Sequence, residues 1–143
     1  MQFGWRWVGR EAMFRRAQTD PLARQMALTI GATRVGVGVA AFFATRPFLR
    51  SMGFSESDST GRTFAKVLGG RDLAMGSLTL AVRNDPSALR AVILASSLLD
   101  LADSAAFGVA AANPETRRPG IVGVFSGGGA ALAGLWAWRR LSA

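Results

Sequence analysis

Residues 88–112 read ALRAVILASSLLDLADSAAFGVAAA, an apolar run in which two acidic residues, Asp100 and Asp103, lie close to the middle. An α-helix needs about 20 apolar residues to cross a hydrocarbon core about 30 Å thick. This run is long enough to do so, and turn-forming residues flank it at Asn84–Ser87 and at Asn113-Pro114. It predicts a membrane-spanning helix whose two carboxylates face other helices rather than lipid.

Three further apolar stretches of similar length occupy residues 21–44, 63–82 and 120–138. Asp20 followed by Pro21 is typical of a helix start, and Pro47 prevents the first helix from continuing. Residues 48–62 then form the longest loop. Strands are not expected, because polar and apolar residues do not alternate over any sustained stretch.

The fold class predicted from these stretches is all-α, an integral membrane four-helix up-and-down bundle formed by residues 21–143 as a single domain. Residues 1–20 mix tryptophan and phenylalanine with arginine. Such a short amphipathic segment either lies flat in the headgroup layer or forms a solvated helix.

Composition excludes several classes of function. The 143 residues are 50% hydrophobic and only 18% charged, against about 25% charged in ordinary domains, so intrinsic disorder is excluded. Cysteine and histidine are absent, which removes disulfides, thiol catalysis, Cys/His zinc sites, histidine-ligated haem and Ser-His-Asp catalysis. We expect no cofactor, no metal site and no enzymatic activity.

A soluble helical bundle is the main alternative, since three of the four stretches contain charges that cost about 2.5–3.5 kcal/mol each at the centre of a bilayer. Two features oppose it. Glycine recurs throughout the apolar stretches, where each would cost a soluble helix about 1 kcal/mol relative to alanine. The charged faces of a soluble bundle, with Glu and Lys four residues apart, are missing.

Basic residues predict the orientation. With Arg24, Lys66 and Arg90 at the ends of the stretches included, the two termini and the second connection have nine Lys and Arg, against six at the other two connections. This asymmetry favours a multi-pass protein of the inner (cell) membrane with both termini in the cytoplasm. The net charge of +8 does not indicate a nucleic-acid partner, because most arginines lie at the ends of the stretches, where anionic lipid headgroups bind them.

Five ionisable residues fall near the middle of the first three stretches, and we call them the charged layer: Arg34, Arg71, Asp72, Asp100 and Asp103. At helical spacing each has small or polar neighbours, namely Gly31 and Gly38; Gly69, Gly76 and Thr79; and Ser96, Ser97 and Ser104. Two cations face three carboxylates, so one carboxylate lacks a fixed partner and is expected to be protonated or to share a site with a cation. We expect this of Asp103, which is furthest from the centre of the layer.

The fourth stretch carries no charge but has Gly123 and Gly127 four residues apart. Such spacing lets helix backbones approach closely. Two interpretations stay open: contact with a second copy or another membrane protein, and packing inside the monomer.

Around Lys66–Gly76, KVLGGRDLAMG, the chain resembles a class of small four-helix bacterial membrane proteins of unknown function with Gly-Arg-Asp in the second span. The likeness covers about residues 26–138, with Arg34 and Asp100 as accompanying charges. The resemblance implies the membrane fold and no reaction.

Three functions follow as hypotheses. The first is a non-enzymatic structural or accessory subunit, surrounded by lipid and associated with its own copies or a larger membrane complex, in which paired charges fix the fold. The second is a small proton- or cation-coupled carrier that uses the carboxylates of the charged layer. The third is a membrane enzyme or binder of a lipid-like or quinone-like ligand. A dry, fully paired layer favours the first, a water-accessible cavity that reaches the carboxylates favours the second, and a lateral opening that holds a lipid-like ligand favours the third.

Overall fold

The computed structural model describes residues 20–54 and 59–141, and the segment predicted at residues 1–20 therefore lies almost wholly outside it. The described residues form five α-helices and no strand, which confirms the all-α class. The helices are α1 (Pro21–Phe43), α2 (Thr45–Met52), α3 (Ser59–Ala81), α4 (Pro86–Ala112) and α5 (Arg117–Arg140).

Two aspartates begin long helices. The Asp20 carboxylate accepts hydrogen bonds from the backbone N–H groups of Leu22 and Ala23 at the start of α1. The Asp85 carboxylate does the same for Ser87 and Ala88 at the start of α4. Each satisfies donors that the helix itself leaves unpaired, and a proline follows each at the first helical position.

The first connection differs from the expected loop over residues 48–62. Helix α2 occupies its first part, and α3 begins at Ser59 rather than at residue 63. Helix α1 ends at Phe43, next to the predicted end at residue 44, and Pro47 lies in the first turn of α2, where a backbone N–H has no partner within the helix. Helix α2 ends at Met52, and the Gly53 that caps it has a φ of 86°, which suits glycine.

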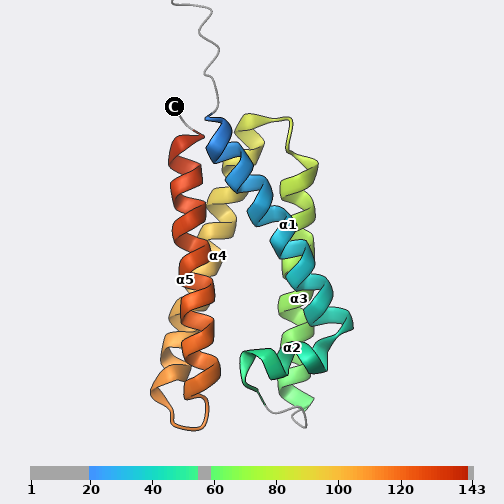
Figure 1. Ribbon diagram of the computed structural model, residues 1–143, viewed down its shortest axis with the longest axis vertical. Coiled ribbons are helices and arrows are strands. Elements are labelled where there is room, and N and C mark those ends of the chain that lie inside the picture. The colour runs from blue at the N-terminus through green and yellow to red at the C-terminus, as the bar shows by residue number, and fades with distance from the viewer. Residues whose placement is uncertain (1–19, 55–58, 142–143) are drawn as a thin grey trace, which may run out of the picture.

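The four long helices alternate in direction and form two pairs, α1 with α3 and α4 with α5 (Figure 1). At the end where α1 begins, α1 also packs against α5, and the two pairs meet there. This end is filled by small and aliphatic side chains from α1, α4 and the C-terminal end of the chain: Ala23, Ala27, Leu89, Ile93, Ala137 and Leu141. Toward α2 the pairs separate (Figure 1).

Glycines bring the backbones of α1 and α3 together. A Cβ atom at Gly38 would lie 2.7 Å from the carbonyl oxygen of Gly69, and one at Gly76 would lie 2.6 Å from the carbonyl oxygen of Gly31. Thr79 fills the space beside Gly31. The small face predicted for both helices is therefore the surface along which they pack.

Helices α4 and α5 pack in the same way. Gly123 lies against the ring of Phe107, and a Cβ atom at Gly127 would lie 3.1 Å from the carbonyl oxygen of Asp100. Of the two interpretations of these glycines, the structure supports packing inside the monomer.

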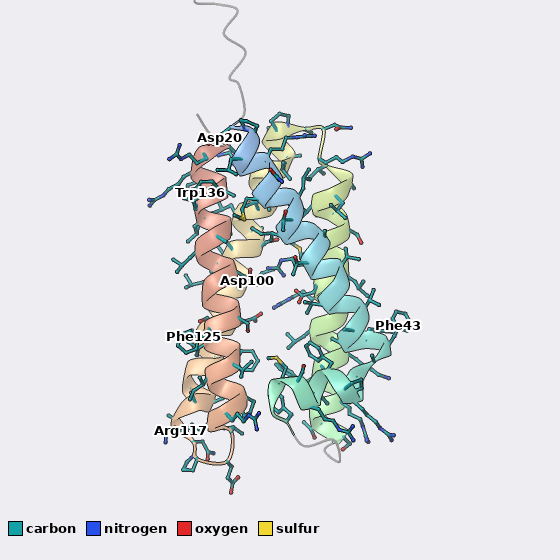
Figure 2. The ribbon with its side chains drawn as sticks, viewed as in Figure 1. Asp20, Phe43, Asp100, Arg117, Phe125 and Trp136 are labelled. Carbon is teal, nitrogen blue, oxygen red and sulfur yellow. The ribbon has the colours of Figure 1, made fainter. Side chains whose placement is uncertain are left out.

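Large apolar side chains cover the outside of the molecule. Phe43, Val109 and Phe125 are each 77% exposed, and Figure 2 shows Phe43 and Phe125 pointing away from the helices on opposite sides. Such a surface suits lipid rather than water. Helices α1, α4 and α5 are long and apolar enough to cross a membrane. Helix α3, predicted as a span, is not among them, and it carries Arg62, Lys66 and the two charges of the layer.

Candidate functional site

Arg34 is the centre of the charged layer. It projects from α1 between the two helix pairs, and its side chain is only 8% exposed. One terminal nitrogen contacts Asp72 Oδ1 on α3 at 2.6 Å, and the other contacts Asp100 Oδ2 on α4 at 2.5 Å. The second nitrogen also donates to the backbone carbonyl of Ser96 at 3.2 Å. One guanidinium thus links α1, α3 and α4.

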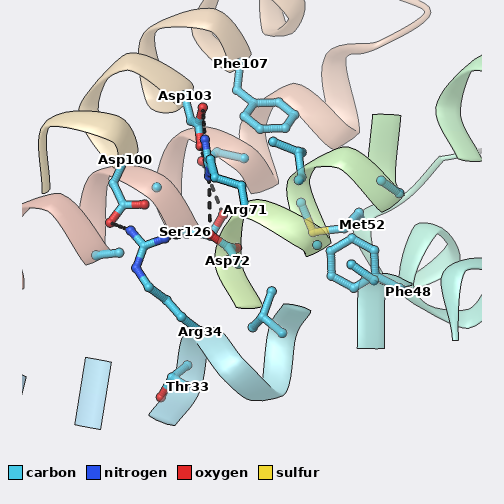
Figure 3. Close-up of a pocket in the computed structure, with 18 of the residues that line it drawn as sticks. Thr33, Arg34, Phe48, Met52, Arg71, Asp72, Asp100, Asp103, Phe107 and Ser126 are labelled. Carbon is cyan, nitrogen blue, oxygen red and sulfur yellow. Dashed lines mark hydrogen bonds and ion pairs between the residues drawn. The ribbon is translucent and has the colours of Figure 1, made fainter. Parts of the chain in front are cut away.

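Arg71 makes the second link. Its two terminal nitrogens donate to the two carboxylate oxygens of Asp103 at 2.9 and 2.5 Å, a two-point contact between α3 and α4. It also lies 3.4 Å from Asp72 Oδ1, which the two guanidiniums share (Figure 3). Arg71 and Asp103 are more accessible than Arg34, with side chains 26% exposed.

The expectation that Asp103 lacks a fixed partner is therefore wrong, because Arg71 binds both of its oxygens. Asp103 is the carboxylate furthest from the centre of the layer, but the side chain of Arg71 is long enough to contact it. Every carboxylate of the layer contacts at least one guanidinium. Three carboxylates still share two cations.

Two carboxylate oxygens remain available. Within residues 20–54 and 59–141, no hydrogen bond is made to Asp72 Oδ2 or Asp100 Oδ1. The Nε atoms of Arg34 and Arg71 are buried and have no hydrogen-bond partner among the residues that the structure describes. The network therefore pairs the terminal nitrogens of both guanidiniums. It leaves two carboxylate oxygens and the two Nε donors without a hydrogen bond with the described residues.

A cavity of about 430 Å³ lies between the helix pairs, and all five charged side chains line it. Most of its wall is apolar and comes from every helix, including α2: Phe48 and Met52 from α2, Phe64 and Leu68 from α3, and Phe107 from α4. In Figure 3, Phe48, Met52 and Phe107 lie beside the charged residues. The ion pairs therefore line a cavity and are not packed on all sides by other side chains.

The predicted supporting polar residues serve mainly the helices themselves. Thr79 and Ser97 donate to the carbonyls of Met75 and Ile93 one turn earlier. Ser104 donates to the carbonyl of Val124 and so ties α4 to α5. Ser96 contributes its backbone carbonyl to Arg34, while its buried hydroxyl has no partner.

The sequence interpretation missed the apolar wall of the cavity and Ser126, which lines it from α5. The wall residues are spread over separate helices, and no spacing in the sequence connects them. The available signal was the amphipathic pattern of residues 45–52, in which Leu49 is buried between the exposed Arg46 and Arg50. In the part of the chain that the structure describes, no group of three or more acidic residues is arranged to hold a metal ion.

The chain belongs to the family described as "Domain of unknown function (DUF4267)", which matches residues 31–139. The match spans all five residues of the charged layer and most of the four long helices. It agrees with the expected resemblance to small membrane proteins without an assigned function. No curated protein and no solved structure matches the chain.

Proposed function

We propose that this member of the DUF4267 family is a non-enzymatic integral membrane protein whose four long helices all cross the bilayer, with the charged layer joining the two helix pairs in its midplane. The observation that carries the proposal is the contact of Arg34 with both Asp72 and Asp100, which connects α1 to its partner α3 and to α4 of the other pair.

The depths of the charges support a common layer. Arg34, Arg71 and Asp100 lie near the middle of α1, α3 and α4, respectively. The distances from the guanidinium nitrogens to the carboxylate oxygens of the layer are only 2.5–3.4 Å. Ionisable side chains at that depth normally face the interior of a bundle and bind one another. Helix α3 can then span the membrane despite its charges, because Arg71 and Asp72 face α1 and α4.

The same arrangement supports a structural role. Removing one partner of a buried pair leaves an uncompensated charge, which costs about 3–5 kcal/mol. The layer therefore fixes how the two pairs sit against each other. We infer a structural or accessory subunit of the cell membrane, with both termini on the cytoplasmic side. Membrane lipids and further copies or other membrane proteins would contact its exposed apolar faces.

Cysteine labelling tests whether α3 crosses the membrane. The chain has no native cysteine, so Ser59→Cys at the start of α3 and Ser87→Cys at the start of α4, just after the connection that follows α3, each create a single thiol in an exposed position. If α3 spans, a membrane-impermeant maleimide added to intact cells labels only Ser59→Cys. Labelling of both thiols, or of Ser87→Cys alone, would contradict the proposed topology.

A second candidate function is a small proton- or cation-coupled carrier, and the cavity that reaches the carboxylates favours it. Transport also needs an opening from the cavity toward the end of the molecule where α1 begins. That end is closed by a core in which Ala23, Ala27 and Ile93 are fully buried. A carrier would have to open this core, whereas a binding or structural protein need not, so the structural role is preferred.

A further inference from the structure

The cavity combines a charge imbalance with apolar walls, and we propose that it binds a small amphipathic organic cation, a molecule with one positive charge on an apolar body. This inference goes beyond the structural role proposed above and does not depend on the number of helices that cross the membrane.

The charge of the layer selects the sign of the ligand. Arg34 and Arg71 supply two positive charges, and the three carboxylates that they contact supply three negative charges. With all five groups ionised the layer carries one net negative charge. In a low-dielectric surrounding an uncompensated charge is costly, and a single cation in the cavity removes the imbalance. An anionic headgroup would increase it.

Accessible acceptors define where the positive end lies. Asp72 and Asp100 line the cavity, and each has one carboxylate oxygen that accepts no hydrogen bond from the described residues. Asp100 is only 7% exposed, so a group that binds it is largely removed from water. An ammonium or similar cation that binds at these oxygens gains a charge-assisted contact without displacing either arginine.

The walls select an organic cation. A cavity of about 430 Å³ falls within the range of about 300–1,000 Å³ usual for small-molecule sites. Rings of Phe48, Phe64 and Phe107 line it, and aromatic faces attract organic cations as well as apolar groups. A Mg²⁺ or Ca²⁺ ion coordinated by the protein prefers several oxygen ligands, which such mostly apolar walls do not offer.

Phe64 lines the cavity and is 51% exposed, and we place the entrance for the ligand beside it. The opposite end is closed by the packed alanines and aliphatic side chains of the core. The charged end of the ligand would lie against Asp72 and Asp100, and its apolar part would extend toward Phe64.

Equilibrium binding of 4-phenylbutylammonium, a monocation with its charge at one end of an apolar body, tests the proposal on the full chain in nanodiscs of a neutral phospholipid. Protein-free nanodiscs give the background, and 4-phenylbutyrate provides an anion of similar size and shape. We expect saturable binding of the ammonium beyond the background, and no protein-dependent binding of the carboxylate. Equal binding of both ions, or no saturable binding, would overturn the proposal.

Two kinds of variant locate the site. Asp100→Asn and Asp72→Asn each make the layer neutral, and we expect binding at least about tenfold weaker because a charge in direct contact with the ligand is lost. Asp85→Asn makes the same chemical change at the start of α4, away from the cavity, and should bind like the native chain. Unchanged binding by a folded Asp100→Asn or Asp72→Asn protein would contradict the assigned position.

A space-filling variant keeps the test decisive if the charge variants do not fold. Ser126 lines the cavity, and its hydroxyl bonds only to carbonyls of its own helix. Ser126→Trp should therefore fold and block the cavity, with binding at least about tenfold weaker. Its matched control is Phe125→Trp, since Phe125 is 77% exposed and outside the cavity wall. Equal binding by these two variants would overturn the proposal.

Discussion

Arg34 on α1 lies 2.5 Å from Asp100 on α4, so a direct ion pair joins helices that belong to different pairs of the fold. The same guanidinium contacts Asp72 at 2.6 Å. Because the side chains of Arg34 and Asp100 are 8% and 10% exposed, solvent screens this contact only weakly. Near the middle of the molecule the two pairs are therefore joined by Arg34, together with the contact of Arg71 on α3 with Asp103 on α4.

We expect Arg34→Leu to lower the free energy of unfolding by about 3–5 kcal/mol, because Asp100 would remain buried without its cation. Thermal unfolding in a neutral detergent, followed by circular dichroism, measures the change. Replacing Asp100 by leucine as well should recover part of the loss, since the uncompensated charge is then gone.

Arg140 is a suitable control: it is 60% exposed and lies 3.7 Å from Asp20. Arg140→Leu should cost less than about 1 kcal/mol. Equal losses for Arg34→Leu and Arg140→Leu would contradict a structural role for the charged layer.

Two glycines of α1 should respond in opposite ways to the same substitution. A Cβ atom at Gly38 would lie 2.7 Å from backbone atoms of Gly69 and Leu73, so α1 and α3 must separate to admit it. We expect Gly38→Ala to destabilise the protein by about 1–3 kcal/mol. A Cβ atom at Gly36 meets nothing within 4 Å, and Gly36→Ala should be neutral or stabilise by up to about 1 kcal/mol. The melting temperatures of the two variants measure this contrast, and a loss at Gly36 as large as that at Gly38 would show that helix contact is not the cause.

Glycines of α5 distinguish packing within the monomer from contact between copies. Gly127 lies beside the backbone of Asp100, whereas a Cβ atom at Gly129 would lie in open space. Gly127→Val should lower the melting temperature without changing the number of copies per particle, and Gly129→Val should do neither. Native mass spectrometry from a mild detergent gives the copy number. If Gly127→Val splits a dimer into monomers at unchanged stability, Gly127 lies in an interface between copies instead.

The sequence predicts the position of each charged residue along its helix, but it does not predict which residue of a neighbouring helix the charge contacts. Helical spacing placed Arg34 beside Gly31 and Gly38, and the structure has all three on the buried face of α1. Which carboxylate Arg71 binds depends on how α3 is rotated against α4. Spacing within one helix carries no information on that rotation, and Asp103 was therefore assigned no partner.

The cavity was beyond reach of the sequence for a related reason. Its wall requires Phe48 and Met52, in a stretch expected to be a loop, to face Phe107 on α4. Pro47 was interpreted as a helix breaker, although proline also fits the first turn of a new helix. Long-range packing of this kind depends on where the two helix pairs separate. That point is set by the small residues of the core at the opposite end, such as Ala23 and Ala137.

The start of α4 gives a pH dependence that is separate from the charged layer. The backbone N–H of Ala88 and the hydroxyl and N–H of Ser87 donate to the Asp85 carboxylate, and these hydrogen bonds lower the pKa of Asp85 below its usual value of about 3.9. A group whose pKa is lower in the folded state stabilises the fold above its unfolded pKa. That contribution is lost as the pH falls through the folded pKa.

Asp85→Asn should therefore melt at a lower temperature than the native chain at pH 7, because the amide lacks the negative charge that the helix N-terminus favours. The difference should shrink as the pH falls below about 3.9, where the native carboxyl becomes protonated, while the other acids titrate alike in both proteins and cancel. Ser87→Ala removes one hydrogen-bond donor to Asp85 and so raises the pKa of Asp85 in the folded state. In this variant the stabilisation by the ionised Asp85 carboxylate should be lost at a higher pH than in the native chain. Melting curves in a neutral detergent between pH 7 and pH 2 measure all three. A difference between the native chain and Asp85→Asn that stays constant over this range would mean that the ionised carboxylate contributes nothing to the start of α4.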